Sequence, residues 1–136
     1  MQSSTALIDS FIKIIGESSL LNENCQAIRA YEGTNLPVPI KKTYFSFSAS
    51  ESSLYLSADA NGNKTEVNSI KISVNCFVPL FLSPAIIHNL AETVMLVLMN
   101  SNKSITGFTV GKTVYDKDVD AFRIGCEIHY QTEKQV

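Results

Sequence analysis

Hydrophobic residues recur with two different periods along this chain, and the change between them marks its central segment. Every second residue from Ile70 to Val78 is apolar, a period typical of a strand with one buried face. Ser83 and Pro84 come next, and a serine N-cap before a proline predicts the start of a helix. From Ala85 onward the apolar spacing is helical. The segment therefore predicts a strand followed by a helix.

The predicted helix over residues 84–99 is more apolar than a helix with one solvent-exposed face. Its polar residues, such as His88 and Glu92, lie in the first turns, so its second half is apolar on nearly all sides. Such a helix has to be covered on more than one side. In a chain of 136 residues, we expect a second copy of the protein to supply part of that cover.

The N-terminal part of the chain predicts another helix and, after it, weaker structure. Over residues 5–17, Leu7, Phe11 and Ile14 recur at helical spacing. Residues 25–31 alternate only weakly and indicate at most a short strand. The first element is therefore expected to be an amphipathic helix that packs on a sheet.

A long two-stranded projection is predicted between Tyr44 and Ile72. Phe45 and Phe47 fall on one face of its first strand, where aromatic side chains suit a half-buried pleated surface. Asn61-Gly62 is a dipeptide typical of tight hairpin turns. We therefore expect a hairpin whose distal part, over residues 49–64, extends away from the core.

The last third of the chain predicts a second hairpin. Residues 105–115 form its first strand, and a turn rich in aspartate follows. Residues 121–130 show the most regular alternation in the chain, while the polar tail from Gln131 to Val136 is expected to fray.

Together these elements predict one α+β domain over residues 1–136. The expected order is α-β-β-α-β-β, with an antiparallel twisted sheet packed by two helices and a long projecting hairpin.

Composition excludes several classes of function. The net charge is −2, with 45% hydrophobic and 18% charged residues, so no basic face predicts nucleic-acid binding. The longest unbroken apolar run, Val94–Met99, is far shorter than the roughly 20 residues of a membrane span. The first residues lack the basic start of a signal peptide. We expect a soluble protein with no membrane or nucleic-acid partner.

The search for chemistry finds few candidates. His88 and Glu92 are spaced as a helical i, i+4 pair, which supports a helix weakly and implies no activity. Arg123, Glu127 and His129 alternate on the polar side of the last strand, where they form either a catalytic face or a solvated or subunit-contact surface. We expect no enzyme activity and no cofactor.

Metal sites are not expected either. Cys25, Cys76 and Cys126 are widely spaced and lack paired ligand spacing, so we expect free thiols that lie mostly in the core. Asp116 and its neighbouring aspartates begin like a calcium loop, but its sixth position is alanine where glycine is required. A tight solvated turn explains them better.

Two stretches of the chain combine into a pattern that suggests a family. The first is Val74-Asn-Cys-Phe-Val-Pro79 followed by the helix Pro84–Met99, and the second is the hairpin Tyr115–Tyr130. In the second, a turn after an aromatic residue leads into a long amphipathic strand. Together with the N-terminal helix, they resemble the centre and the closing hairpin of bacteriophage tail terminator (tail completion) proteins.

The resemblance implies a structural virion protein of a phage or prophage-derived tail, made in the host bacterial cytoplasm. Proteins of this family form a ring, commonly a homohexamer, on the last ring of the tail tube. The ring stops growth of the tube and offers a surface to the head connector. The implied partners are other copies of the chain, the tail tube protein and the neck or connector protein.

A closed ring requires two different surface patches that meet between neighbouring subunits. Two other interpretations stay open, namely another tail or neck subunit such as a tube protein, and a small ligand-binding or enzymatic α+β domain. The candidate subunit-contact residues are Phe45, Phe47, Phe77, Met95, Leu96 and Met99.

Overall fold

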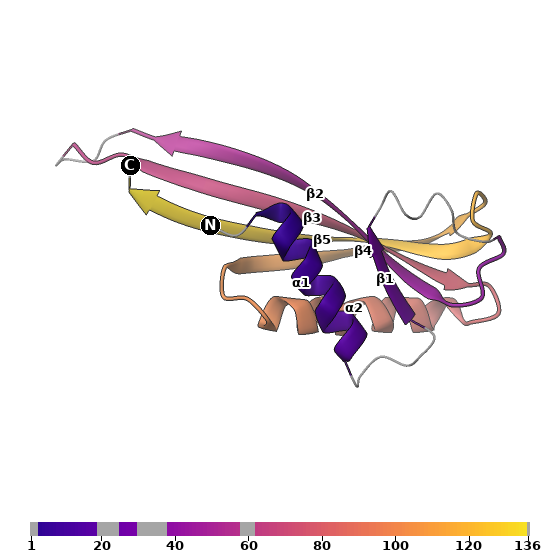
Figure 1. Cartoon of the computed structure of the whole chain (residues 1–136). Coiled ribbons are helices and arrows are strands. Elements are labelled where there is room, and N and C mark those ends of the chain that lie inside the picture. Colours follow the sequence, from indigo (N-terminus) through magenta and orange to yellow (C-terminus); the bar gives the residue numbers. More distant parts are fainter. Residues whose placement is uncertain (1–2, 19–24, 30–37, 58–61, 136) are drawn as a thin grey trace.

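One five-stranded sheet with two helices on one of its faces makes up the described part of the chain (Figure 1). The computed structural model describes residues 3–18, 25–29, 38–57 and 62–135. The strands lie in the order β1-β2-β3-β5-β4. The predicted α+β class is therefore confirmed. The elements are α1 (Ser4–Glu17), β1 (Cys25–Arg29), β2 (Thr43–Leu56), β3 (Thr65–Pro79), α2 (Pro84–Asn100), β4 (Ile105–Asp116) and β5 (Ala121–Gln135).

The observed element order differs from the predicted one by the strand β1. Its residues pair in parallel with the start of β2, from Cys25 opposite Thr43 to Arg29 opposite Phe47. The sheet is therefore mixed, and the predicted order α-β-β-α-β-β was wrong by one strand. Weak alternation hides β1 because its side chains are mostly half-buried at the edge of the sheet.

The projecting hairpin of β2 and β3 is longer than predicted, and a third strand, β5, lies beside it. β2 and β3 pair without interruption from Tyr44 opposite Phe77 to Leu56 opposite Thr65, and β5 continues beside β3. Past Ile105, the first residue of β4, the described sheet consists of these three strands. They extend past both helices (Figure 1). We call this part the arm and define it as Ser52–Leu56, Thr65–Ser69 and Gln131–Gln135.

The polar C-terminal tail is part of the arm as far as Gln135, so the prediction that it frays was wrong for residues 131–135, while Val136 lies outside the described residues. Gln131–Gln135 pairs in register with Thr65–Ser69 of β3. The amide of Gln131 also donates a hydrogen bond to the carbonyl of Ser104, at 2.9 Å. Backbone pairing holds this segment although its side chains carry little apolar surface.

The core lies between the helices and one face of the sheet. α1 packs on β1 and β2, and α2 packs on β4 and β5. Alternate positions of β3 and β5 supply the floor of this core, as the period of two predicts. The largest fully buried side chains are Phe11, Phe45, Phe47, Leu7, Ile70, Ile72, Ile87, Met95, Leu98, Ile124, Ile128 and Val74.

A small apolar cluster lies apart from the main core. Ile28, Ile40, Tyr44 and Ala121 are buried in it, and Phe77 packs against it. Tyr44 faces this cluster whereas the next residue, Phe45, enters the main core, which confirms the predicted alternation of the strand.

Both helices begin at a serine cap, which was predicted for α2 only. Ser83 caps α2 by accepting a hydrogen bond from the amide of Ala85 at 3.3 Å, and Pro84 occupies the first helical turn. Ser3 caps α1 in the same way through the amide of Ala6, at 3.1 Å. The caps fix where each helix starts and hence which residues face the sheet.

The two predicted hairpin turns are described to different extents. Gly62 adopts a φ of +80°, which a glycine in a hairpin turn tolerates, whereas Asn61 lies outside the described residues. Between β4 and β5 the chain turns at residues 117–120, with Asp120 at a φ of +49°. This confirms the predicted aspartate-rich turn.

Candidate functional site

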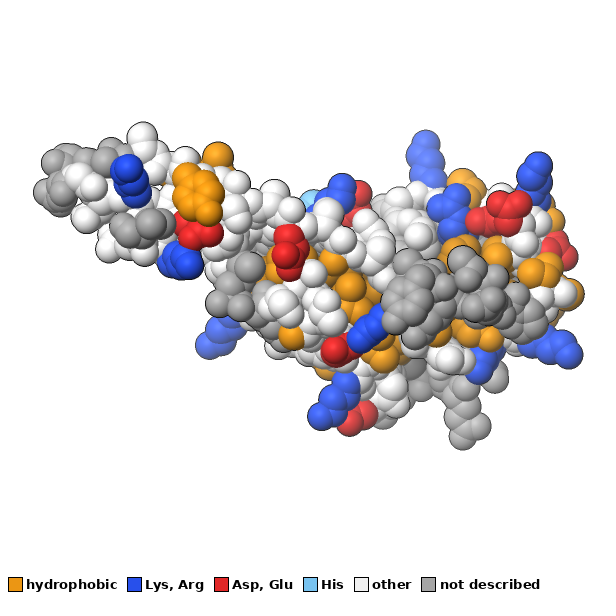
Figure 2. All heavy atoms as spheres, turned by 45° about the horizontal axis from the view of Figure 1, so that its top comes forward, with side chains coloured by type: hydrophobic (Ala, Val, Ile, Leu, Met, Phe, Trp, Pro, Cys, Tyr) orange, Lys and Arg blue, Asp and Glu red, His pale blue; other side chains and the backbone are white. Residues whose placement is uncertain are grey.

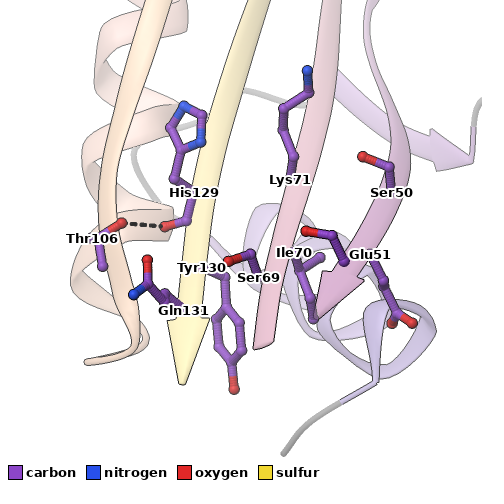
Figure 3. Close-up of a pocket in the computed structure, with 10 residues that line it drawn as sticks. Ser50, Glu51, Ser69, Ile70, Lys71, Thr106, His129, Tyr130 and Gln131 are labelled. Carbon is purple, nitrogen blue, oxygen red and sulfur yellow. Dashed lines mark hydrogen bonds between the residues drawn. The ribbon is translucent and has the colours of Figure 1, made fainter. Parts of the chain in front are cut away.

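The face of the sheet opposite the helices carries a row of polar side chains. Lys71 and His129 stand on neighbouring strands and point to the same side (Figure 3). The carboxylate of Glu127 lies between them, with Oε1 3.5 Å from Lys71 Nζ and Oε2 3.8 Å from His129 Nε2. Each of these side chains is close to half exposed, so solvent screens the charges.

A shallow hollow of about 250 Å³ lies along this row. Ser50, Ser69 and Gln131 line it together with Lys71 and His129 (Figure 3). Hydroxyl, amide and ammonium groups of this kind suit a polar or anionic group at the surface. They do not enclose a reacting atom, because the charged side chains stand in solvent.

The structure separates the predicted row of Arg123, Glu127 and His129. The Arg123 guanidinium turns to the β4–β5 turn, where its Nε donates to Asp116 Oδ2 at 3.1 Å. Glu127 instead pairs with Lys71 on β3. The ion pair joins Lys71 on β3 to Glu127 on β5. The spacing of residues within one strand cannot predict it, because the two residues lie far apart in the sequence.

A second hollow, of about 500 Å³, lies further along the same face. Gly111 and Gly125 line it with Ser73, Asn75 and Glu127. A Cβ added at Gly111 would lie 2.8 Å from the carbonyl oxygen of Gly125, so the two strands approach closely only because residue 111 is glycine. The hollow is open and results from missing side chains.

Hydrogen bonds to Asp116 and Asp120 stabilise the β4–β5 turn. Asp116 accepts from Arg123 and from the amide of Asp118, and Asp120 accepts from the hydroxyl of Tyr115. Their oxygens therefore have protein partners, in agreement with the expected tight turn. Among the described residues, no group of three or more His, Cys, Asp or Glu side chains could hold a metal ion.

The cysteines behave as small core residues. Cys76 and Cys126 are buried, as expected, and Cys25 is half-buried. Burial raises the pKa of the Cys126 thiol to about 11 and raises the pKa of Cys76 as well. Thiols that stay protonated in this way are poor nucleophiles and poor metal ligands.

His88 and Glu92 form the predicted helical pair on α2. His88 Nε2 lies 3.4 Å from Glu92 Oε1, and both side chains are about half exposed. No other charged group is part of this ion pair, so it supports the helix weakly.

Three of the predicted contact residues are buried within one chain. Phe45 and Met95 are 0% exposed and Phe47 is 1% exposed, so none of them offers a surface to a neighbour. Phe47 packs on Phe11 of α1, with ring centroids 6.2 Å apart. The expectation that α2 needs a second copy to cover Met95 was wrong, because the chain covers that side itself.

The other predicted contact residues remain accessible to different degrees. Leu96 is 47% exposed on the outer side of α2, while Phe77 and Met99 are half-buried. Of the six predicted contact residues, Leu96 is therefore the side chain best placed for a contact.

Two groups of exposed apolar residues were not among the six predicted contact residues. The first lies where β3 turns into α2, at Leu80, Phe81 and Ile86, and we call it the corner patch. Phe81 is 74% exposed there. Strand alternation carries no signal at Leu80 and Phe81, because they lie between the end of β3 and the start of α2.

The second group lies on the arm. Leu54, Tyr55 and Leu56 are each between 45% and 67% exposed, and Figure 2 shows hydrophobic side chains there within otherwise polar surroundings. Consecutive apolar residues on a strand expose both of its faces when no helix covers it. The arm therefore carries apolar surface on both sides.

A groove of about 490 Å³ lies at the base of the arm, on the helix side. It lies between β2 and the first turns of α1, next to the last residue of β1, and we call it the α1 groove. Its lining residues are Ser4, Thr5, Ile8, Arg29, Phe47, Ser48 and Ala49.

Two comparisons of the sequence with known proteins find no match. No protein-family model matches the chain, and no curated protein matches its sequence. In the part of the chain that the structure describes, no helix is long and apolar enough to cross a membrane.

Proposed function

We propose that this chain is a structural subunit of a bacteriophage or prophage-derived tail. In this proposal its copies form a ring that caps the tail tube and joins it to the head connector. The ring contains six copies, the number implied by the sequence resemblance. Apart from β1, the order of the helices and strands is the one on which that resemblance is based.

The observation that carries the proposal is the arm. Three strands run past both helices and present Leu54, Tyr55 and Leu56 to solvent. Apolar side chains on a projecting element favour contact with another protein. In the proposed ring, the arm reaches the tube subunits below it.

The corner patch and Leu96 supply the contact between neighbouring subunits in the proposed ring. In a head-to-tail ring one patch meets a different patch of the next copy, so an exposed apolar group near the helices suits one half of the contact. Phe81, the most exposed large apolar residue of the described chain, is the strongest candidate for its centre.

The shallow polar hollow does not favour an enzyme over this function. Its polar side chains Lys71, Glu127 and His129 are close to half exposed, and Glu127 lies between the other two. A catalytic site would need a group held near a substrate and protected from water.

Deletion of the coding sequence from the phage or prophage that carries it tests the proposal. Without the cap, tube subunits should continue to add, so electron micrographs should show overlong tails separated from full heads. The intact gene supplied from a plasmid should restore normal particles. Normal particles from the deletion alone would contradict the proposal, and particles with no tails at all would favour a tube protein.

A further inference from the structure

Among the described residues, no strand lies beside the outer side of β2 along the arm. β1 pairs only as far as Arg29 opposite Phe47, and β2 continues for nine more residues, Ser48–Leu56, all of them exposed. We call Ser48–Leu56 the free edge; Figure 1 shows it along the outside of the arm. In the described chain, no strand pairs with the backbone groups on that side, so they are available to another strand.

The free edge lacks the features that usually prevent strand addition. Its pairing with β3 contains no bulge, and it has no proline or lysine. Its one charged residue, Glu51, accepts a hydrogen bond from the amide of Ser4 at 2.8 Å and so turns toward α1. The opposite edge differs, because β4 has two irregularities in its register and carries Lys112.

We propose that the free edges of two copies of this chain pair with each other in antiparallel fashion about a twofold axis at Ser52. Ser52 is the middle residue of the free edge, so this register alone pairs all nine residues. Leu54 then lies opposite Ser50, and Glu51 lies opposite Ser53. A register centred on Glu51 would place two carboxylates directly opposite each other, which is unfavourable.

The α1 groove supports a second copy as the occupant of the edge. In the proposed register, Tyr55 of the partner subunit lies opposite Ala49 and on the same face of the sheet, which is the helix side. Ala49 lines the α1 groove together with Thr5 and Ile8. The partner's Tyr55 thus fills the groove. The twofold axis repeats the contact, so Tyr55 of the first copy fills the α1 groove of the partner subunit.

Exposure of Tyr55 agrees with this assignment. Its side chain is 67% exposed in a single chain, and its hydroxyl donates only one described hydrogen bond, to Glu66 Oε1 at 3.3 Å. Tyrosine can bury its ring in an apolar groove and keep its hydroxyl at a polar rim. Ser4 and Thr5 supply such a rim.

The inference does not depend on the proposed function. The dimer uses the free edge and the α1 groove, whereas neighbouring subunits of the proposed ring meet through the corner patch and Leu96. The contact of the arm with the tube in the proposed function uses the same residues, Leu54–Leu56, so at that surface the dimer and the tube contact exclude each other. A chain of any function could form the dimer, and a ring could form from chains that never dimerise through the arm.

A cysteine substitution on the twofold axis tests the register. The two copies of S52C face each other, and directly opposite Cβ atoms lie about 5 Å apart, close to the separation that a disulfide requires. The matched control S50C places its two thiols about 13 Å apart along the strands. Mild oxidation should therefore cross-link S52C as a dimer and leave S50C at the level of the unmodified chain.

Charge substitutions at the same position test whether the pairing drives association. S52K and S52D should each raise the dimer dissociation constant about fivefold in analytical ultracentrifugation, because like charges then oppose each other. An equimolar mixture should restore the affinity by forming the mixed dimer. Circular dichroism checks that each variant is folded.

Three results would overturn the inference. The first is a monomer at every concentration tested, which would leave the edge to an extended segment of another protein. The second is equal cross-linking of S52C and S50C. The third is an oligomer unaffected by S52K, S52D and their mixture; it would overturn the arm dimer and leave the proposed ring standing.

Discussion

At the scale of the residue, the position along a strand or helix decides whether an apolar side chain is buried or available. On β2, Phe45 and Phe47 point to the helices and are buried in the core. On α2, Met95 and Leu96 are neighbours in sequence, yet one is 0% and the other 47% exposed. Two adjacent apolar residues on one helix therefore have different physical roles.

Alanine substitutions at these two neighbours should have very different effects. Met95→Ala should lower the free energy of unfolding by about 2–5 kcal/mol, because it leaves a cavity between the helices and the sheet. Leu96→Ala should change it by no more than about 0.5 kcal/mol, because solvent already reaches that side chain. Urea denaturation of both variants measures the difference. Similar losses would mean that Leu96 is covered, as it would be inside a stable oligomer.

At the scale of the element, the strands of this chain continue past the residues that show apolar alternation, because their backbones pair with neighbouring strands. β1 has almost no alternation and β5 ends in a polar tail, yet both are paired strands. A strand at the edge of a sheet gains its hydrogen bonds from one neighbour, and its side chains can remain polar. The alternation of buried positions consequently underestimates the length of the sheet.

Hydrogen exchange should show that the C-terminal part of β5 is structured. We expect alternate amides of residues 131–135 to exchange at least about tenfold more slowly than in the same chain unfolded in urea, because they donate to backbone carbonyls. The Gln131 amide, which donates to Ser104, should be among the protected ones. Exchange at the unfolded rate for the whole segment would show that the tail frays.

At the scale of the whole molecule, the corner patch and the arm expose large apolar side chains, and the lining of the polar hollow exposes none. The sheet face between the patch and the arm is lined by serine, asparagine and charged residues. Such a distribution favours contacts with other proteins over binding of a small molecule.

Charge introduced into the corner patch should affect assembly without affecting the fold. Phe81→Asp should leave the free energy of unfolding within about 0.5 kcal/mol of the original, since the ring is 74% exposed. In the proposed ring it should also abolish rescue of the deletion strain. Asn89→Asp adds the same charge to the outer side of α2 and removes no apolar surface, so it should rescue normally. Full rescue by Phe81→Asp would exclude the corner patch from the ring contact.

The sequence alone determined the features that depend on neighbours along the chain. The alternation in Ile70–Val78, the cap at Ser83-Pro84 and the turn around Asp116–Asp120 are local, and each predicts its element correctly. The same reasoning places the thiols of Cys76 and Cys126 in the core. These features follow from short-range sterics and hydrogen bonding, which any structure of this chain has to satisfy.

Only the tertiary structure decided which surfaces remain uncovered. Whether Met95 is buried depends on what packs against α2, and whether the edge of β2 is free depends on where β1 stops. The ion pair of Lys71 with Glu127 and the groove beside Ala49 likewise join segments far apart in sequence. Burial and pairing of this kind are set by the packing of elements that are distant in sequence. The hydrophobic effect is non-directional, so the local pattern of apolar residues does not specify which element packs on which.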